Sequence, residues 1–172
     1  MELVQACEEL DVKKFRANQL WEWLWQKSAR SFDEMTNLSK DFRQKLSDKY
    51  TFNTLSIAHA QKSSDGTIKY AFKLDDGFLI EGVLIPTSNR VTACISSQVG
   101  CSLSCTFCAT GFMKRERNLR IDEIYDQVAI LKKEAEREYN INLSNIVLMG
   151  MGEPLLNYAN VIGGIEKVTA PD

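Results

Sequence analysis

Three cysteines stand within eight residues of this chain, and their spacing constrains how the rest can fold. Cys101, Cys105 and Cys108 are separated by gaps of three and then two residues. Cysteine thiolates bind iron-sulfur clusters, and a 4Fe-4S cubane is normally held by four of them. Three thiolates leave one iron open. The spacing therefore predicts a cluster-binding loop whose open iron is available to a small molecule.

A structural zinc site is the main alternative for these thiols. Zinc in such sites takes four ligands in a tetrahedral arrangement. The one histidine, His59, falls in a different predicted region, and Cys7 lies near the N-terminus, so no fourth ligand is evident. The triplet also follows a predicted strand and precedes a predicted helix, as a cluster loop would. We therefore favour the iron-sulfur interpretation.

The composition fits a globular protein with a buried core. Hydrophobic residues make up 44% of the chain and charged residues 26%. The longest apolar run, residues 78–85, is interrupted by Glu81 and is far shorter than the roughly 20 residues that span a bilayer. The N-terminus is acidic where a secretory signal would be basic. We expect a cytoplasmic protein without membrane contact, in which the cysteines act as ligands or catalytic thiols rather than as disulfides.

The net charge of -2 gives no global indication of nucleic-acid binding. A local basic cluster follows the cysteines, formed by Lys114, Arg115, Arg117 and Arg120. Such a cluster could contact RNA, and a solvated loop without a partner explains it equally well.

Residues 1–52 are predicted to form a small helical domain. Ala17, Leu20 and Leu24 recur at helical spacing and indicate one apolar stripe. A further helix is predicted from about residue 40 to 49, because Ser39 is a good N-cap and Asp41 follows in the first turn.

Residues 53–90 are predicted to form an antiparallel meander. Strand-like runs at 57–61, 67–74 and 78–85 are separated by Asp65-Gly66 and by Asp75-Asp-Gly77. Asp-Gly pairs between such runs are typical of hairpin turns. Pro86 ends the last run.

Residues 91–172 are predicted to alternate between strands and helices. A strand over 91–96 leads into the cysteine loop, an amphipathic helix covers 121–139, a buried strand covers 145–149, and a helical pattern runs over 157–168. This order predicts an α/β fold with a parallel sheet. Two strand-helix units cannot close a barrel or bury both faces of a parallel sheet, so we expect the chain to be the first part of a longer protein.

The cysteine spacing resembles the signature of the radical S-adenosylmethionine (SAM) superfamily, and three separated motifs make the resemblance more specific. The motifs are Val91-Thr-Ala-Cys-Ile-Ser-Ser-Gln-Val-Gly-Cys-Ser-Leu-Ser-Cys-Thr-Phe-Cys-Ala-Thr-Gly111, Arg117-Asn-Leu119 and Met149-Gly-Met-Gly-Glu-Pro-Leu-Leu-Asn157. Together they resemble the dual-specificity RNA methyltransferase family, which methylates C2 of adenine in large-subunit ribosomal RNA (rRNA) and in transfer RNA (tRNA). A related branch methylates C8 instead.

This resemblance implies a partial (β/α)6 radical SAM barrel after the helical domain and the meander. It also implies that Cys101, Cys105 and Cys108 each bind one iron of a 4Fe-4S cluster, whose remaining iron takes SAM. Gly152 and Glu153 match the family's Gly-Glu-Pro motif, which contacts the amino group of SAM. A glycine permits close backbone approach, and a carboxylate complements an ammonium group.

Two further residues take catalytic roles under the same resemblance. Cys94, taken alone, is a small buried apolar group in a strand. In the family, a cysteine at this offset faces the substrate and helps to resolve a covalent RNA-enzyme intermediate. Glu81, taken alone, is a solvent-facing residue of an edge strand, and it matches a family glutamate assigned as proton acceptor.

The implied mechanism uses SAM twice, first to methylate a second catalytic cysteine and then to generate a radical that activates this methyl group. That cysteine belongs to the C-terminal part of the family, and no cysteine follows Cys108 here. The 172 residues alone are therefore not expected to complete methylation.

The resemblance further implies rRNA and tRNA substrates, an electron donor such as flavodoxin, and a monomer at full length. Methylation at C2 or C8, and preference for rRNA or tRNA, stay open. The alternatives are a non-catalytic RNA-binding or folding module, and a radical SAM enzyme that acts on protein or small molecules.

Overall fold

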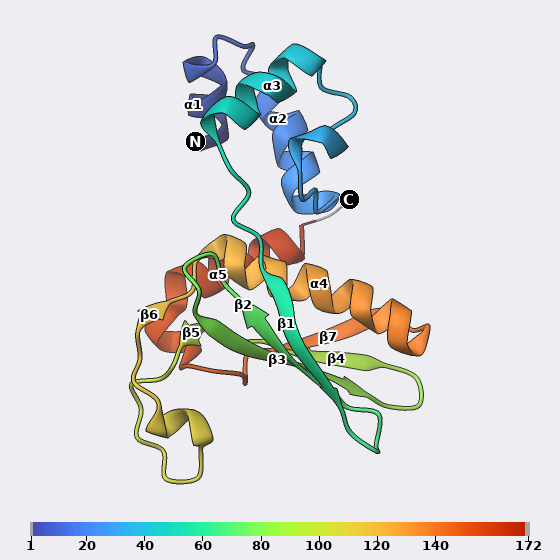
Figure 1. Cartoon of the computed structure of the whole chain (residues 1–172), viewed down its shortest axis with the longest axis vertical. Coiled ribbons are helices and arrows are strands. Elements are labelled where there is room, and N and C mark those ends of the chain that lie inside the picture. The colour runs from blue at the N-terminus through green and yellow to red at the C-terminus, as the bar shows by residue number, and fades with distance from the viewer. Residues whose placement is uncertain (1, 171–172) are drawn as a thin grey trace. The chain divides into compact units, whose positions relative to one another are not determined.

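The computed structural model describes residues 2–170, which divide into two compact units, residues 2–53 together with residue 170, and residues 54–169 (Figure 1). Each unit has its own hydrophobic core. No helix among the described residues has both the length and the apolar character needed to cross a membrane.

The first unit is helical, as the sequence predicts. It contains α1 (Glu2–Glu9), α2 (Arg16–Trp21) with a π-helical continuation η1 (Glu22–Gln26), a 3-10 turn η2 (Phe32–Glu34) and α3 (Lys40–Lys49). The hydroxyl of Ser39 accepts a hydrogen bond from the backbone N–H of Phe42, at 3.3 Å, and caps α3. Fully or almost fully buried side chains form the core of this unit: Cys7, Ala17, Leu20, Ala29, Met35, Leu38, Phe42 and Leu46.

The second unit is built on one five-stranded sheet in the order β1-β2-β3-β4-β7. The strands are β1 (Ser56–Lys62), β2 (Ile68–Lys73), β3 (Leu79–Pro86), β4 (Val91–Cys94) and β7 (Leu143–Val147). The first four pair in antiparallel fashion, and β7 pairs with β4 in parallel. The predicted meander and the first predicted α/β strand thus belong to a single sheet.

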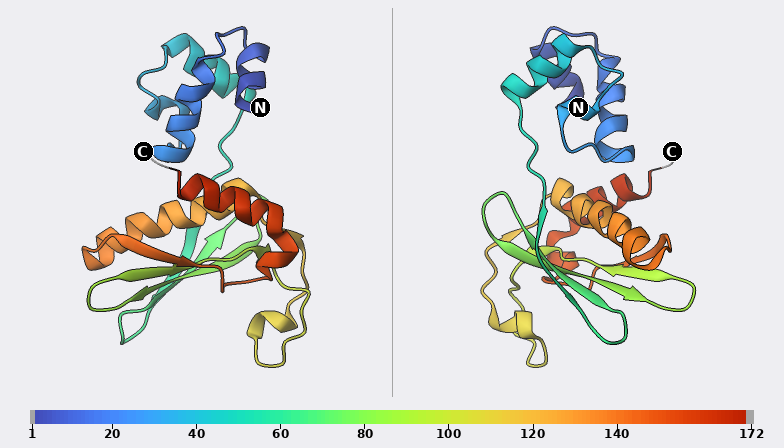
Figure 2. Two further views of the ribbon diagram at one scale, coloured as in Figure 1. Left: turned by 180° about the vertical axis from the view of Figure 1, so that it is seen from behind. Right: turned by 45° about the vertical axis from the view of Figure 1, so that its right-hand side comes forward.

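Helices cover one face of this sheet, and the cysteine loop projects away from them (Figure 2). The covering elements are α4 (Ile121–Tyr139) and α5 (Tyr158–Val168). Because strand side chains alternate between faces, Tyr70 and Phe72 of β2 point into the core under the helices, whereas Lys69 and Lys73 are exposed on the other face. We call the latter, which these helices do not cover, the open face.

The predicted mixed α/β fold is confirmed, and α4 has the predicted bounds. β7 begins and ends two residues before the predicted strand over 145–149. The remaining elements are short: β5 (Gln98–Val99), β6 (Arg117–Asn118), η3 (Ala109–Phe112) and η4 (Pro154–Asn157).

Candidate active site

The candidate site lies where the parallel strands β4 and β7 end side by side. The backbone N–H of Ile95 donates to the carbonyl of Val147 at 2.9 Å, and the N–H of Gly150 donates back to the carbonyl of Ile95 at 3.0 Å. The N–H of Ser97 donates to the carbonyl of Met151 at 2.9 Å. The start of the cysteine loop is therefore hydrogen-bonded to the start of the loop that carries the Gly-Glu-Pro motif. Both loops leave the sheet at the C-terminal ends of its parallel strands, where α/β proteins build ligand sites.

The three cysteines of the loop are partly exposed free thiols. The N–H of Cys108 donates to the carbonyl of Cys105 at 3.1 Å, and the N–H of Gly111 donates to the carbonyl of Cys108 at 2.9 Å. A side chain at Gly111 would place its Cβ 2.8 Å from the carbonyl oxygen of Cys105, so this turn requires a glycine. Hydrogen bonds from backbone N–H groups lower the pKa of the Cys108 thiol below its usual value. The N–H of Gly111 has the larger effect, and the N–H of Thr110 the smaller. They favour the thiolate, which is the form that binds metals.

The chemistry of these donors fits an iron-sulfur cluster, because three partly exposed thiols share one loop and backbone N–H groups stabilise one of them as thiolate. Across residues 2–170, no three His, Cys, Asp or Glu side chains are gathered as metal ligands. Cluster binding by Cys101, Cys105 and Cys108 therefore stays a prediction. Of the two other candidate ligands, His59 lies on β1, and Cys7 lies in the core of the first unit, where burial raises the pKa of its thiol.

Gly152 and Glu153 lie in the loop after β7. Gly152 has a φ of +91°, and an added Cβ would lie 2.4 Å from the Cβ of Gln98. The N–H of Glu153 donates to Oε1 of Gln98 at 3.0 Å. Oε1 of Glu153 accepts from the N–H of Leu155 at 3.0 Å and caps η4. The local fold thus accounts for the glycine and for one carboxylate oxygen, while contact with SAM stays a prediction.

Glu81 and Cys94 lie on the same open face of the sheet. Val83 is the register partner of Cys94, and Glu81 is two residues from Val83 on β3. The Glu81 carboxylate pairs with Nζ of Lys69 at 2.6 Å, and its backbone carbonyl accepts from the hydroxyl of Ser96 at 2.6 Å. Cys94 is 9% exposed, and this burial raises the pKa of its thiol. A hydrogen bond from the backbone N–H of Met149 lowers the same pKa, but by less.

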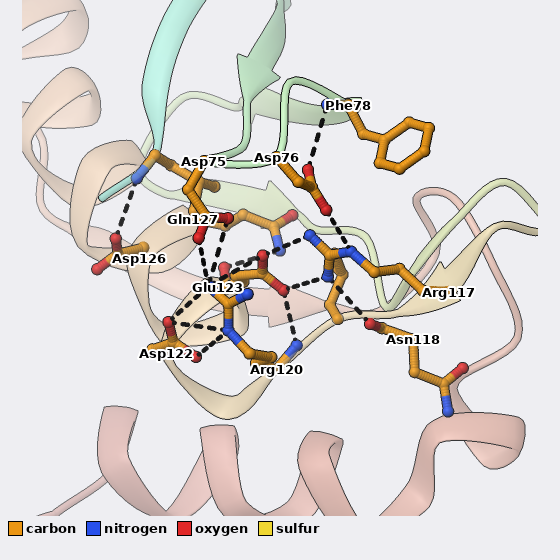
Figure 3. A network of polar contacts seen from close by, with 12 residues as sticks. Asp75, Asp76, Phe78, Arg117, Asn118, Arg120, Asp122, Glu123, Asp126 and Gln127 are labelled. Carbon is orange, nitrogen blue, oxygen red and sulfur yellow. Dashed lines mark hydrogen bonds and ion pairs between the residues drawn. The ribbon is translucent and has the colours of Figure 1, made fainter. Parts of the chain in front are cut away.

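Arg117 and Arg120 of the predicted basic cluster are engaged in ion pairs (Figure 3). The guanidinium of Arg117 binds both carboxylate oxygens of Glu123 at 2.8 Å and Oδ2 of Asp76 at 2.6 Å. The Glu123 side chain is 1% exposed. Arg120 pairs with Asp122 at 3.2 Å and with Asp75 at 3.5 Å. Both arginines therefore tie the turn between β2 and β3 to the end of the cysteine loop.

These contacts shift the pKa values of the paired groups. The hydrogen bonds to Glu123 raise the pKa of Arg117, and the hydrogen bond from Arg117 lowers the pKa of Asp76. The other two cations of the cluster are exposed: Lys114 lies 3.9 Å from Glu116, and Arg115 donates to Asn118 at 3.4 Å. The basic cluster thus divides into a structural pair and an exposed pair.

The sequence is similar to known proteins over most of its length. Residues 1–51 match the model of the ribosomal RNA large subunit methyltransferase N-terminal domain. A protein of Cytophaga hutchinsonii named "probable dual-specificity RNA methyltransferase RlmN" is 61% identical over 160 residues, which are 93% of this chain and 44% of the relative. A protein of the same name from Christiangramia forsetii is 57% identical over 93% of this chain and 46% of its own length. The chain belongs to this RNA methyltransferase family.

A solved structure supports the same assignment. The radical SAM methyltransferase from Sphaerobacter thermophilus superposes with a TM-score of 0.84 and is 38% identical, over 97% of this chain and 49% of that protein. The chain therefore spans about half the length of the family members that it matches.

Two buried amides hold the family's motifs in place, and neither is among the predicted site residues, although Asn157 is the last residue of the third motif. The side chain of Gln127 on α4 accepts from the N–H of Ser96 at 2.8 Å and donates to its carbonyl at 3.1 Å. Nδ2 of Asn157 donates to the carbonyls of Ser97 and Leu119, both at 2.8 Å. In the sequence, Gln127 stands out only as a polar residue next to Val128 on the apolar face of a predicted helix. The spacing of residues does not reveal which groups Gln127 would contact.

Proposed function

We propose that this chain forms the cofactor-binding part of a radical SAM enzyme that methylates C2 of adenine in rRNA and tRNA. The observation that carries the proposal is that the cysteine loop and the Gly152-Glu153 turn are hydrogen-bonded to each other at the ends of β4 and β7, while Glu81 and Cys94 lie on the adjoining open face of the sheet. Family membership supports RNA as the substrate class.

Cys101, Cys105 and Cys108 would hold the 4Fe-4S cluster, and Gly152 with Glu153 would hold the methionyl end of SAM. Together the cluster and SAM supply, when bound, a carbon-centred radical that activates a methyl group for addition to a carbon that is a poor nucleophile. The chain's own contribution is to fix these groups next to the substrate. Gln98 serves this purpose, because it accepts from the N–H of Glu153 and packs against Gly152.

Glu81 and Cys94 would handle protons on the open face. The raised pKa of Cys94 keeps its sulfur protonated at neutral pH. An acceptor must therefore take this proton before the sulfur can act as a nucleophile. Glu81 is the carboxylate proposed to accept a proton from the substrate. An electron donor such as flavodoxin would supply the reducing electron.

Anaerobic reconstitution with iron and sulfide tests the cluster. We expect about four iron atoms per chain and a broad visible absorbance. Cys105→Ala should lose both, and the matched control Cys7→Ala, in the core of the other unit, should keep them. A colourless protein with one zinc per chain would contradict the proposal. A chain that binds an rRNA or tRNA hairpin without taking up iron would support the RNA-binding module instead.

A further inference from the structure

Lys69 and Cys94 belong to one row across the open face of the sheet. Lys69 of β2 is the register partner of Val83 on β3, and Val83 is the register partner of Cys94 on β4. Neighbouring strands lie about 4.8 Å apart, so Lys69 and Cys94 flank β3 at a separation of about 10 Å. Glu81 lies two residues from Val83, toward the position where the cysteine loop begins.

Lys69 reaches along this face to Glu81. Its Nζ lies 2.6 Å from Oε1 of the carboxylate, and the two side chains are 52% and 46% exposed. In the part of the chain that the structure describes, this lysine is the one cation paired with Glu81. A half-exposed ion pair of this kind contributes little to the stability of a fold.

The backbone of Glu81 is held from the opposite side. The hydroxyl of Ser96 donates to the Glu81 carbonyl at 2.6 Å and accepts from the N–H of Met151 at 2.9 Å. Ser96 thereby connects Glu81 to both loops of the candidate site. With its main chain fixed by Ser96, the carboxylate of Glu81 has its orientation set by the side chain that it contacts, which is that of Lys69.

We propose that Lys69 is a positioning residue that holds the Glu81 carboxylate toward the open face, with Oε1 bound and Oε2 directed at the substrate. This inference rests on the proposed function, in which Glu81 accepts a proton. The acceptor oxygen takes the proton from the substrate carbon, the electron pair of that C–H bond stays with the substrate, and Lys69 keeps its own protons. Removing the ammonium group frees the carboxylate to rotate, which lowers the rate without preventing RNA binding.

The first arm of the test uses the 172-residue chain and does not depend on methylation. The carboxyl carbon of Glu81 is observed by NMR at pH 7 and assigned through Glu81→Gln. Lys69→Met should move this resonance, and Lys69→Arg should largely restore it. The matched control Lys73→Met removes an exposed lysine on the same face of the same strand and should leave the resonance in place. An unmoved resonance in Lys69→Met would overturn the proposal, whatever the reaction of the enzyme.

The second arm measures methylation in a polypeptide of the family's full length that contains these residues. Lys69→Met should lower the single-turnover rate by about tenfold or more while changing the KM for RNA by less than about threefold. Lys69→Arg should recover most of the rate, and Lys73→Met should match the parent. Lys69→Met should add nothing to the defect of Glu81→Gln, because both act through one carboxylate.

The two arms separate the possible failures. A Lys69→Met enzyme with the parental rate, beside an inactive Glu81→Gln enzyme, would overturn the role of Lys69 and leave the proposed function intact. A parent that cleaves SAM but methylates no RNA would refute the proposed function, and with it the role of Lys69 in catalysis. The NMR result would then still report on the contact itself.

Discussion

At the scale of single residues, two glycines with similar backbone angles have different surroundings. Gly152 has a φ of +91° and Gly77 a φ of +87°, which an L-residue adopts only with strain. An added Cβ at Gly152 would overlap the side chain and backbone nitrogen of Gln98, whereas one at Gly77 would meet no atom within 4 Å. The first glycine is required by packing and conformation, and the second by conformation alone.

The pair makes a matched prediction. Gly77→Ala should lower the free energy of unfolding of the second unit by about 1–2 kcal/mol, which is the cost of the backbone conformation. Gly152→Ala should cost about 1–3 kcal/mol more, because Gln98 must move. Urea unfolding followed by far-UV circular dichroism measures both values. Equal losses for the two variants would show that Gln98 relaxes freely and does not brace the Gly-Glu-Pro loop.

At the scale of elements, the helix α4 shows how much a sequence pattern predicts. Its bounds followed from the recurrence of apolar residues such as Ile124, Val128 and Leu131, because helical periodicity is local in the sequence. The ion pair of Arg117 with Asp76 joins residues 41 positions apart, and no local pattern encodes it. The sequence therefore predicted Arg117 as a member of a basic cluster, whereas the structure gives it a role in holding β6 to the β2–β3 turn.

Buried Glu123 is the centre of this arrangement, and its removal gives a prediction. Glu123→Gln leaves Arg117 without its best partner, and breaking a buried pair by removing one charge costs about 3 kcal/mol. Glu136→Gln changes an exposed glutamate on the same helix and should cost less than about 0.5 kcal/mol. Urea unfolding of the second unit measures the difference. Equal stability of the two variants would mean that Asp76 alone suffices to hold Arg117.

The same distinction applies to the candidate site. The cysteine triplet and the Gly-Glu-Pro motif could be recognised from sequence because their spacing is short and fixed. The contact of Lys69 with Glu81 depends on strand register across a hairpin, and the contacts of Gln127 with Ser96 span 31 residues. Residues that position a site can therefore be identified only once the fold is known. The residues that they position can be recognised from a sequence motif.

At the scale of the whole molecule, the chain has two separate hydrophobic cores, in residues 2–53 and 54–169. Met35 is fully buried in the first core, and Ile80 is fully buried in the second. All three tryptophans, Trp21, Trp23 and Trp25, belong to the first unit. Tryptophan fluorescence therefore reports on the first unit, and amide exchange in β2 and β3 reports on the second.

These probes test whether the units unfold independently. Met35→Ala should lower the stability of the first unit by about 2–5 kcal/mol, shift the fluorescence transition to lower urea, and leave amide protection in β2 and β3 unchanged. Ile80→Ala should do the reverse. If either substitution weakened both signals equally, the chain would be one cooperative unit. Independent unfolding transitions would mean instead that the helical unit can vary in sequence and stability without disturbing the end of β4, where the cysteine loop begins.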